Sequence, residues 1–140
     1  MATELEGGCF CGAVRYRVTG SPRIVVHCHC TMCRRAQGAA MVTWLIVNQQ
    51  DFALLKGEPA WYRSSDHGRR GFCGTCGTPL LFTTSERPAV VDITAGSLDR
   101  PEAVTPERHV HAVNRVAWLA MNDGLPRHSE GGRSPLLGES

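Results

Sequence analysis

The stretch HCHCTMCRR, residues 27–35, places three cysteines and two histidines in seven positions and then adds two arginines. The other four cysteines form a C-x-C beside several glycines and a C-x-x-C inside FCGTCGTP. Because the number of cysteines is odd, a set of disulfides within the chain would leave one of them over. Thiols also stay reduced in the cytosol, so the seven cysteines are better explained as metal ligands or reactive thiols than as disulfides. The three groups are Cys28, Cys30 and Cys33; Cys9 and Cys11; and Cys73 and Cys76.

Length and charge narrow the class of protein. A chain of 140 residues corresponds to one domain with a modest core. Its 15 basic and 13 acidic residues give a formal charge of +2, which provides no electrostatic case for a nucleic-acid or membrane partner. The N-terminal MATELEGGCF has neither the basic nor the apolar region of a secretory signal, so we expect a cytoplasmic protein. The sequence leaves a homodimer open.

Short apolar segments separated by Gly, Pro, Ser or Asp predict a mainly β protein. Residues 13–19 alternate apolar and polar side chains, and residues 41–47 are rich in β-branched and aromatic side chains. CRRAQGAA predicts one or two helical turns that end at Gly38. Residues 110–121 fit either a strand or a helical turn. Further strands are expected near 24–26, 52–57, 61–65, 80–85 and 89–96.

How the seven thiols divide between metal ions determines the chemistry. Tetrahedral zinc, with Zn–S bonds near 2.3 Å, needs sulfurs about 3.8 Å apart, and glycine-containing turns allow that approach. Two pairs make a closed four-thiolate site from Cys9, Cys11, Cys73 and Cys76. The trio then supplies three ligands and leaves a fourth position open, which is the arrangement of catalytic rather than structural zinc.

Two other divisions of the cysteines remain open at this point. The pairs Cys30–Cys33 and Cys73–Cys76 could form one site and leave the other three cysteines unassigned. Alternatively, His27 or His29 could close the trio, which would make both sites purely structural. His29 lies between two cysteines, so we expect its side chain to point away from the metal. Both histidines are better explained as hydrogen-bond partners or polar strand residues.

Several motifs in order resemble the glutathione-dependent formaldehyde-activating enzyme family. They are GGCFCGAVRYRVTG, HCHCTMCRRAQG, FCGTCGTPL, AGSLDRPEAVTPERHVHA and DGLP, and they span residues 7–128. The resemblance implies a mainly β, Mss4-like, zinc-stabilised single domain of short antiparallel strands. We expect this domain to cover residues 1–128, followed by a loosely ordered tail, rich in Gly, Ser and Pro, over residues 129–140.

The resemblance also implies roles for the cysteines. A structural zinc would be held by Cys9, Cys11, Cys73 and Cys76, and a catalytic zinc by Cys28, Cys30 and Cys33, giving two Zn²⁺ per chain. The implied activity is that of a carbon–sulfur lyase that makes or cleaves an S-hydroxymethyl thiol adduct from glutathione and formaldehyde or a related small aldehyde. Three thiolates leave a zinc site with net charge −1, which favours capture of a thiol over strong carbonyl activation.

The residues around the trio carry weaker signals. Arg34 and Arg35 could clamp a substrate carboxylate, or could simply offset thiolate charge on a solvated face. His109 and His111 would share a face in a strand, and a structural role is favoured for both. Asp123 is expected in a turn. The competing function is a non-catalytic zinc-stabilised domain that binds a protein partner.

Overall fold

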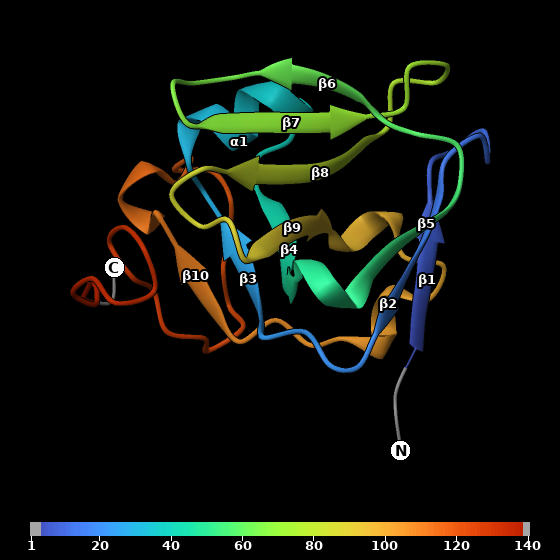
Figure 1. Ribbon diagram of the computed structural model, residues 1–140. Coiled ribbons are helices and arrows are strands. Elements are labelled where there is room, and N and C mark those ends of the chain that lie inside the picture. The colour runs from blue at the N-terminus through green and yellow to red at the C-terminus, as the bar shows by residue number, and fades with distance from the viewer. Residues whose placement is uncertain (1–3, 139–140) are drawn as a thin grey trace. The chain divides into compact units, whose positions relative to one another are not determined.

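The computed structural model describes residues 4–138, which form two compact units. Unit 1 comprises the residues up to Ile24 and Leu45–Val104, and unit 2 comprises Val25–Trp44 and the residues from Thr105 onward. Short strands predominate in the chain, as the sequence predicts (Figure 1). Within the part of the chain that the structure describes, no helix is long and apolar enough to cross a membrane.

A three-stranded antiparallel sheet in unit 1 carries the first cysteine pair. Its order is β1 (Glu4–Gly8), β2 (Arg15–Thr19) and β5 (Phe52–Lys56). The predicted alternation appears in β2, where Tyr16 and Val18 are buried between more exposed neighbours. The connection between β1 and β2 contains Cys9 and Cys11, so pairing of these two strands fixes where both sulfurs lie.

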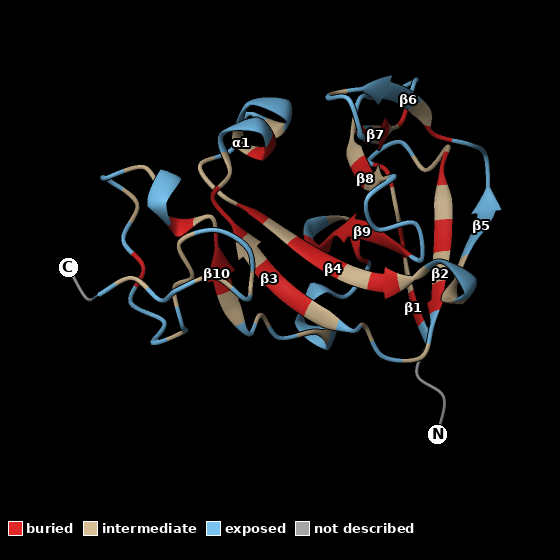
Figure 2. Ribbon diagram, turned by 60° about the vertical axis from the view of Figure 1, so that its left-hand side comes forward, coloured by how far each residue is buried: buried red, intermediate tan, exposed pale blue. Residues whose placement is uncertain are grey.

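The second group of strands in unit 1 runs antiparallel from β6 to β9 (Figure 1). Every residue of β9 is buried, and Figure 2 shows this strand in red. The sequence does not predict β7, because Gly and Arg in GRRGF have little intrinsic preference for strands; pairing with β6 and β8 supplies the stabilisation. Cys73 follows β7 directly. The bounds are β6 Ala60–Arg63, β7 Gly68–Phe72, β8 Pro79–Thr84 and β9 Val90–Thr94.

The GSLD motif anchors the hairpin that carries the first cysteine pair. The Arg15 guanidinium donates two hydrogen bonds to the Asp99 carboxylate, at 2.8 and 2.5 Å, which holds the pKa of Asp99 below its usual range. The hydroxyls of Tyr16 and Ser97 lie 2.7 Å apart. The motif therefore connects β2 to the chain after β9.

Short 3-10 helices complete this unit: η1 Gln49–Asp51, η2 Ala95–Ser97 and η3 Pro101–Ala103.

Unit 2 contains the strand, turn and helix that hold the cysteine trio. β3 (Ile24–Cys28) leads into α1 (Thr31–Gln37), and β4 (Val42–Asn48) begins in this unit. Gly38 ends α1 in the left-handed conformation, as predicted. The helix lies mostly exposed in Figure 2, and Cys33 is its buried residue.

One strand pair differs from the expected antiparallel arrangement. β10 (Arg108–Val110) pairs parallel with β3 and places His109 opposite His27. Because β10 arrives much later in the chain rather than through a hairpin, a parallel pairing is accessible to it. His111 then takes a left-handed conformation and η4 (Ala112–Asn114) follows, so His109 and His111 do not share a strand face.

The buried side chains of unit 1 set its stability. Leu80, in β8, is fully buried, whereas Leu54, in β5, is 41% exposed. We expect Leu80→Ala to lower the free energy of unfolding by about 2–5 kcal/mol, because it leaves a cavity in packed surroundings. Leu54→Ala removes the same atoms from a partly solvated site and should cost less than about 1 kcal/mol. Urea unfolding of the two variants measures the difference, and equal losses would contradict this assignment of the core.

Candidate metal centres

Four cysteines of unit 1 converge at one point. The sulfurs of Cys9, Cys11, Cys73 and Cys76 all lie within 4.8 Å of one another, although 62 residues separate Cys11 from Cys73. The Cys9 and Cys11 sulfurs are 3.6 Å apart, and those of Cys11 and Cys73 are 3.8 Å apart. Two turns, one after β1 and one after β7, therefore supply two sulfurs each.

The two turns share the same local construction. The Gly12 N–H donates to the Cys9 carbonyl at 3.1 Å, and the Gly77 N–H donates to the Cys73 carbonyl at 2.8 Å. Both glycines have positive φ, 81° and 82°, which an L side chain would strain. Each turn thereby reverses the chain within a few residues of its cysteines, and this explains the glycine that follows each pair.

Backbone and hydroxyl groups form hydrogen bonds with three of these sulfurs. The Val14 N–H donates to Cys9 Sγ at 3.2 Å, and the Thr75 and Cys76 N–H groups donate to Cys73 Sγ at 3.4 Å each. Thr78 Oγ1 lies 3.1 Å from Cys76 Sγ, and this contact with Thr78 lowers the pKa of Cys76 to about 5. A thiolate is the form that binds a metal.

Thr78 also connects the two turns, because its hydroxyl oxygen accepts the Phe10 N–H at 3.0 Å. Sequence reasoning missed this residue. A threonine two positions after a cysteine carries no signal of its own, and only the fold brings it to the other turn.

The donor set fits zinc. Sulfur–sulfur distances of 3.6 and 3.8 Å are close to the value of about 3.8 Å that a tetrahedral ion with four thiolates requires. Four like charges at this separation repel one another unless a cation lies between them. A closed site of this kind has no position left for a substrate.

The cysteine trio of unit 2 comes from a single strand–turn–helix segment. Cys28 ends β3, Cys30 caps the N-terminus of α1, and Cys33 lies in its first turn. Their sulfurs lie within 4.8 Å of one another, and no histidine or carboxylate joins the group among the described residues. The trio can therefore supply three ligands to one metal ion, and a fourth would have to come from elsewhere.

Cys30 and Cys28 differ in how readily their thiols ionise. Hydrogen bonds from Cys28 and Cys33, together with the backbone N–H groups of Cys33 and Met32, hold the pKa of Cys30 far below its usual range. Hydrogen bonds with the Cys30 and Cys33 side chains, together with burial, raise the pKa of the Cys28 thiol. Without a cation, ionisation of one thiol therefore opposes ionisation of its neighbours. The trio, like the four-cysteine group, is suited to holding a positive ion.

A chain of polar side chains extends from the trio to the surface. His29 Nε2 lies 2.8 Å from His109 Nδ1, and His109 Nε2 lies 2.8 Å from Asp123 Oδ2. His29 and His109 are fully buried, and burial, aided by His109 and His27, lowers the pKa of His29 to about 4. Burial alone would raise the pKa of Asp123, but hydrogen bonds from the Leu125 N–H and from His109 outweigh it and lower this pKa.

Sequence reasoning did not connect these three residues. It assigned His109 a structural role and Asp123 a turn, because the spacing from 29 to 109 to 123 follows no local period. Asp123 Oδ1 does accept the Leu125 N–H at 3.1 Å within the DGLP turn. The parallel pairing of β10 with β3 is the feature that brings His109 beside His29. His109 and Asp123 also line a shallow pocket of about 240 Å³.

The other candidate residues lie near the trio without joining it. Arg34 is half-buried and Arg35 is exposed, both in the helix that contains Cys33. His27 Nδ1 lies 2.8 Å from the Thr43 hydroxyl, and its ring packs against His109. The structure thus places His27 among hydrogen-bond partners rather than among the sulfurs.

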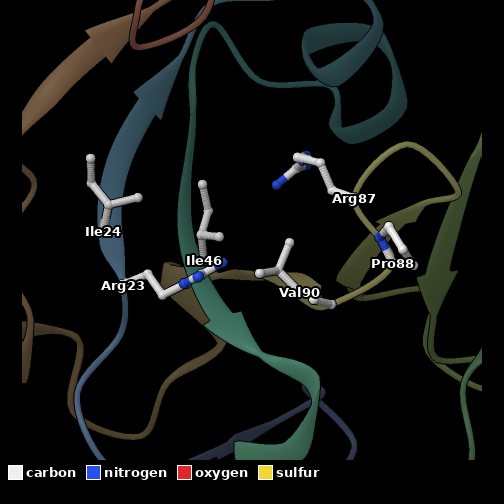
Figure 3. Close-up of a pocket in the computed structure, with 7 residues that line it drawn as sticks. Arg23, Ile24, Ile46, Arg87, Pro88 and Val90 are labelled. Atoms are coloured by element: carbon white, nitrogen blue, oxygen red, sulfur yellow. The ribbon is translucent and has the colours of Figure 1, made fainter.

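A separate apolar hollow lies in unit 1 (Figure 3). Its volume is about 430 Å³, and the side chains of Arg23, Ile46 and Val90 are among those around it. Arg87 lines it too, but its guanidinium is already paired with Asp92, at 2.9 Å. No cysteine contributes to this hollow, so it is distinct from both sulfur groups.

Fold and site together define a mainly β, cysteine-rich protein with two candidate metal sites. A family model described as "Glutathione-dependent formaldehyde-activating enzyme" matches residues 4–114. The match covers most of the chain, and the chain belongs to this family. It includes all seven cysteines and His109, whereas Asp123 lies beyond it.

The proteins similar to this chain include one compared by sequence and one compared by structure. A protein of Halomonas elongata, named as a candidate glutathione-dependent formaldehyde-activating enzyme, is 29% identical over 124 residues, which cover 82% of this chain and 79% of that protein. A crystal structure of a Rhodobacter sphaeroides protein matches with a TM-score of 0.55 and 22% identity, over 72% of this chain and 91% of that one. The second likeness concerns the fold alone.

The two sulfur groups should contribute differently to stability. A metal bound by Cys9, Cys11, Cys73 and Cys76 would connect segments far apart in the chain, whereas one bound by the trio would connect residues within six positions. We expect Cys73→Ser to lower the thermal unfolding midpoint by roughly 10 °C or more beyond the loss in Cys33→Ser. Calorimetry of the metal-loaded proteins measures this. The two variants form a matched pair, because both replace a buried thiol with a hydroxyl; equal losses would contradict the prediction.

Proposed function

We propose that this protein is a zinc-dependent carbon–sulfur lyase that forms or cleaves the S-hydroxymethyl adduct of a thiol and a small aldehyde, with glutathione and formaldehyde as substrates. The observation that carries the proposal is the trio: three sulfurs within 4.8 Å of one another, with no fourth ligand from the described residues. Membership of the glutathione-dependent formaldehyde-activating enzyme family supports the choice of substrates. The reaction would take place in the cytoplasm, where glutathione is abundant and thiols stay reduced.

Each chain would bind two zinc ions, one structural and one catalytic. The structural ion belongs to Cys9, Cys11, Cys73 and Cys76, whose sulfur spacing supports a closed tetrahedral site. The catalytic ion belongs to Cys28, Cys30 and Cys33. When bound by these three cysteines, the ion would leave one position open and would there favour the thiolate form of a substrate thiol.

The reaction balances without an oxidant or a reductant. The substrate sulfur forms a bond to the formaldehyde carbon, the carbonyl π bond breaks, and the proton that left the thiol ends on the new hydroxyl. Cleavage runs the same steps in reverse. The chain's residues therefore need to hold a thiolate, orient an aldehyde and provide a polar contact for the developing hydroxyl.

Arg34 and Arg35 are the candidate contacts for the carboxylates of glutathione. Both lie in the last turn of α1, directly after Cys33, so their guanidinium groups start from the same helix as the trio. Arg35 is exposed, and guanidinium groups pair with carboxylates through two hydrogen bonds.

The competing function is a zinc-stabilised domain that binds a protein partner. Phe10 favours it, because this side chain is 95% exposed between Cys9 and Cys11, and Trp118 is 76% exposed. Exposed aromatic side chains are enriched in protein interfaces. This function predicts two bound metal ions and no effect of the protein on the exchange between formaldehyde and its thiol adduct.

The trio variant Cys30→Ser separates the two functions. We expect elemental analysis to give two zinc ions per wild-type chain and one per variant chain, since each sulfur group holds one ion. Exchange NMR of glutathione with formaldehyde should show acceleration by the wild-type protein and only the uncatalysed rate with the variant. Loss of zinc without loss of acceleration would exclude a catalytic role for the trio. Two zinc ions without acceleration in the wild type would favour the partner-binding function.

A second prediction concerns recognition of the thiol. We expect Arg35→Ala to raise KM for glutathione by about tenfold, because one charge-assisted contact is worth roughly 1.5 kcal/mol or more. The same variant should leave KM for 2-mercaptoethanol unchanged, because that thiol has no carboxylate. Arg133→Ala is the control, since Arg133 is an exposed arginine outside α1. Equal effects of Arg35→Ala on both thiols would contradict the assignment.

A further inference from the structure

Thr78 contacts both turns of the four-cysteine group in unit 1. Its hydroxyl oxygen accepts the Phe10 N–H at 3.0 Å, and Phe10 is the central residue of the C-x-C in the first turn. The same oxygen lies 3.1 Å from Cys76 Sγ in the second turn. The backbone carbonyl of Thr78 also accepts the Cys73 N–H at 3.0 Å. One hydroxyl group thus joins a metal-binding sulfur to a turn 68 residues away in the chain.

The direction of these hydrogen bonds follows from the groups involved. A backbone N–H only donates, so the Thr78 oxygen is the acceptor toward Phe10, and its hydroxyl hydrogen remains available. A sulfur bound to a metal ion is a thiolate, which carries no hydrogen and only accepts. With a metal ion bound, the hydroxyl hydrogen is therefore donated to Cys76 Sγ. The backbone N–H groups of Cys11 and Thr78 also donate to this sulfur.

Cys76 lies on the more accessible side of the group. Cys9 and Cys73 are buried, whereas Cys11 is exposed and Cys76 is partly exposed. A free thiol or a chelator in solution therefore meets the sulfurs of Cys11 and Cys76 before the other two. Glutathione, the substrate in the proposed function, is itself a free thiol. A closed site must resist exchange with the same compound that the open position of the trio accepts.

We propose that Thr78 is a positioning residue for the metal ion of the four-cysteine group: its hydroxyl, held by the Phe10 N–H, donates to the Cys76 thiolate and slows exchange of that ligand for a free thiol. Hydrogen bonds to a charged acceptor are stronger than those between neutral groups. The inference rests on the proposed function for zinc in this group and for glutathione as the competing thiol. It adds the side chain that retains the structural ion while the trio exchanges ligands.

Substitutions in a single turn test this role. Thr78→Val removes the hydroxyl and keeps a branched side chain of similar shape. Thr75→Val is the matched control, because the Thr75 side chain is exposed and its contact with Cys73 Sγ comes from the backbone N–H. Thr78→Ser keeps the hydroxyl and should behave as the wild type. Thr78→Ala and Thr78→Ser differ in the hydroxyl alone, and this second pair replaces the first if Thr78→Val does not fold.

Release of zinc to the chromogenic chelator pyridylazoresorcinol, at fixed pH with glutathione present, measures retention of the ion. The Cys30→Ser background isolates the four-cysteine group, since its zinc is the one expected to remain. We expect Thr78→Val to accelerate release about 10- to 100-fold, and Thr75→Val and Thr78→Ser to stay within about threefold of the background. Equal rates in Thr78→Val and Thr75→Val, or in Thr78→Ala and Thr78→Ser, would overturn the inference.

Cobalt(II) in the same background gives a readout that a purely structural role would not change. Bound by thiolates, it absorbs through sulfur-to-metal charge transfer, and a hydrogen bond to a thiolate raises the energy of this transition because it stabilises the sulfur lone pairs. Thr78→Val should therefore move the absorption band to longer wavelength, and Thr78→Ser should leave it in place. An unchanged band in Thr78→Val would show that the hydroxyl does not donate to Cys76, against the inference.

The outcomes separate this inference from the proposed lyase. Absence of zinc from the four-cysteine group would overturn the structural ion and the inference together. Zinc present in the group, with equal release rates in the paired variants, would reject the role of Thr78 alone. Absence of accelerated adduct exchange in the wild type would reject the lyase, while zinc release and the cobalt band still decide the role of Thr78.

Discussion

The structure of unit 1 depends on the close approach of four cysteine sulfurs. Two of these sulfurs lie 3.6 Å apart within one turn, and two lie 3.8 Å apart although 62 residues separate them in the chain; as thiolates they would repel one another unless a cation lay between them. The surrounding groups are arranged for this charge: backbone N–H groups donate to Cys9 and Cys73, and Thr78 contacts Cys76. The strands that precede each turn, β1 and β7, serve to hold these sulfurs in place.

The two sulfur groups differ in how many candidate ligands the fold provides. Two turns on different sheets supply four sulfurs, which is the number that a closed tetrahedral ion requires. A single strand–turn–helix segment supplies three sulfurs to the other, because it contains three cysteines and no further ligand from the described residues joins them. Family membership and an incomplete ligand set agree with the proposed lyase, in which the substrate thiol takes the remaining position.

Polar groups next to the trio extend this argument. His29 follows Cys28 in the chain, yet its hydrogen bonds lead away from the sulfurs to His109 and Asp123. The parallel pairing of β10 with β3 places His109 in position, and the DGLP turn places Asp123. A mainly β fold therefore connects a surface carboxylate, through two buried rings, to the segment that contains the trio.

Local chemistry explains what could be predicted from the sequence. Some features depend only on neighbours a few residues away, and these could be predicted from the sequence. They are the glycines after each cysteine pair, the alternation in β2 and the end of α1 at Gly38. The grouping of cysteines into four and three followed from ligand counting and from the family resemblance. In contrast, β7 forms only because β6 and β8 flank it, β10 pairs parallel with β3, and His29, His109 and Asp123 meet across distant segments. The sequence by itself determined the candidate ligands and their turns; tertiary structure alone decided the hydrogen-bond partners, because no short-range pattern specifies which remote side chain a buried group will face.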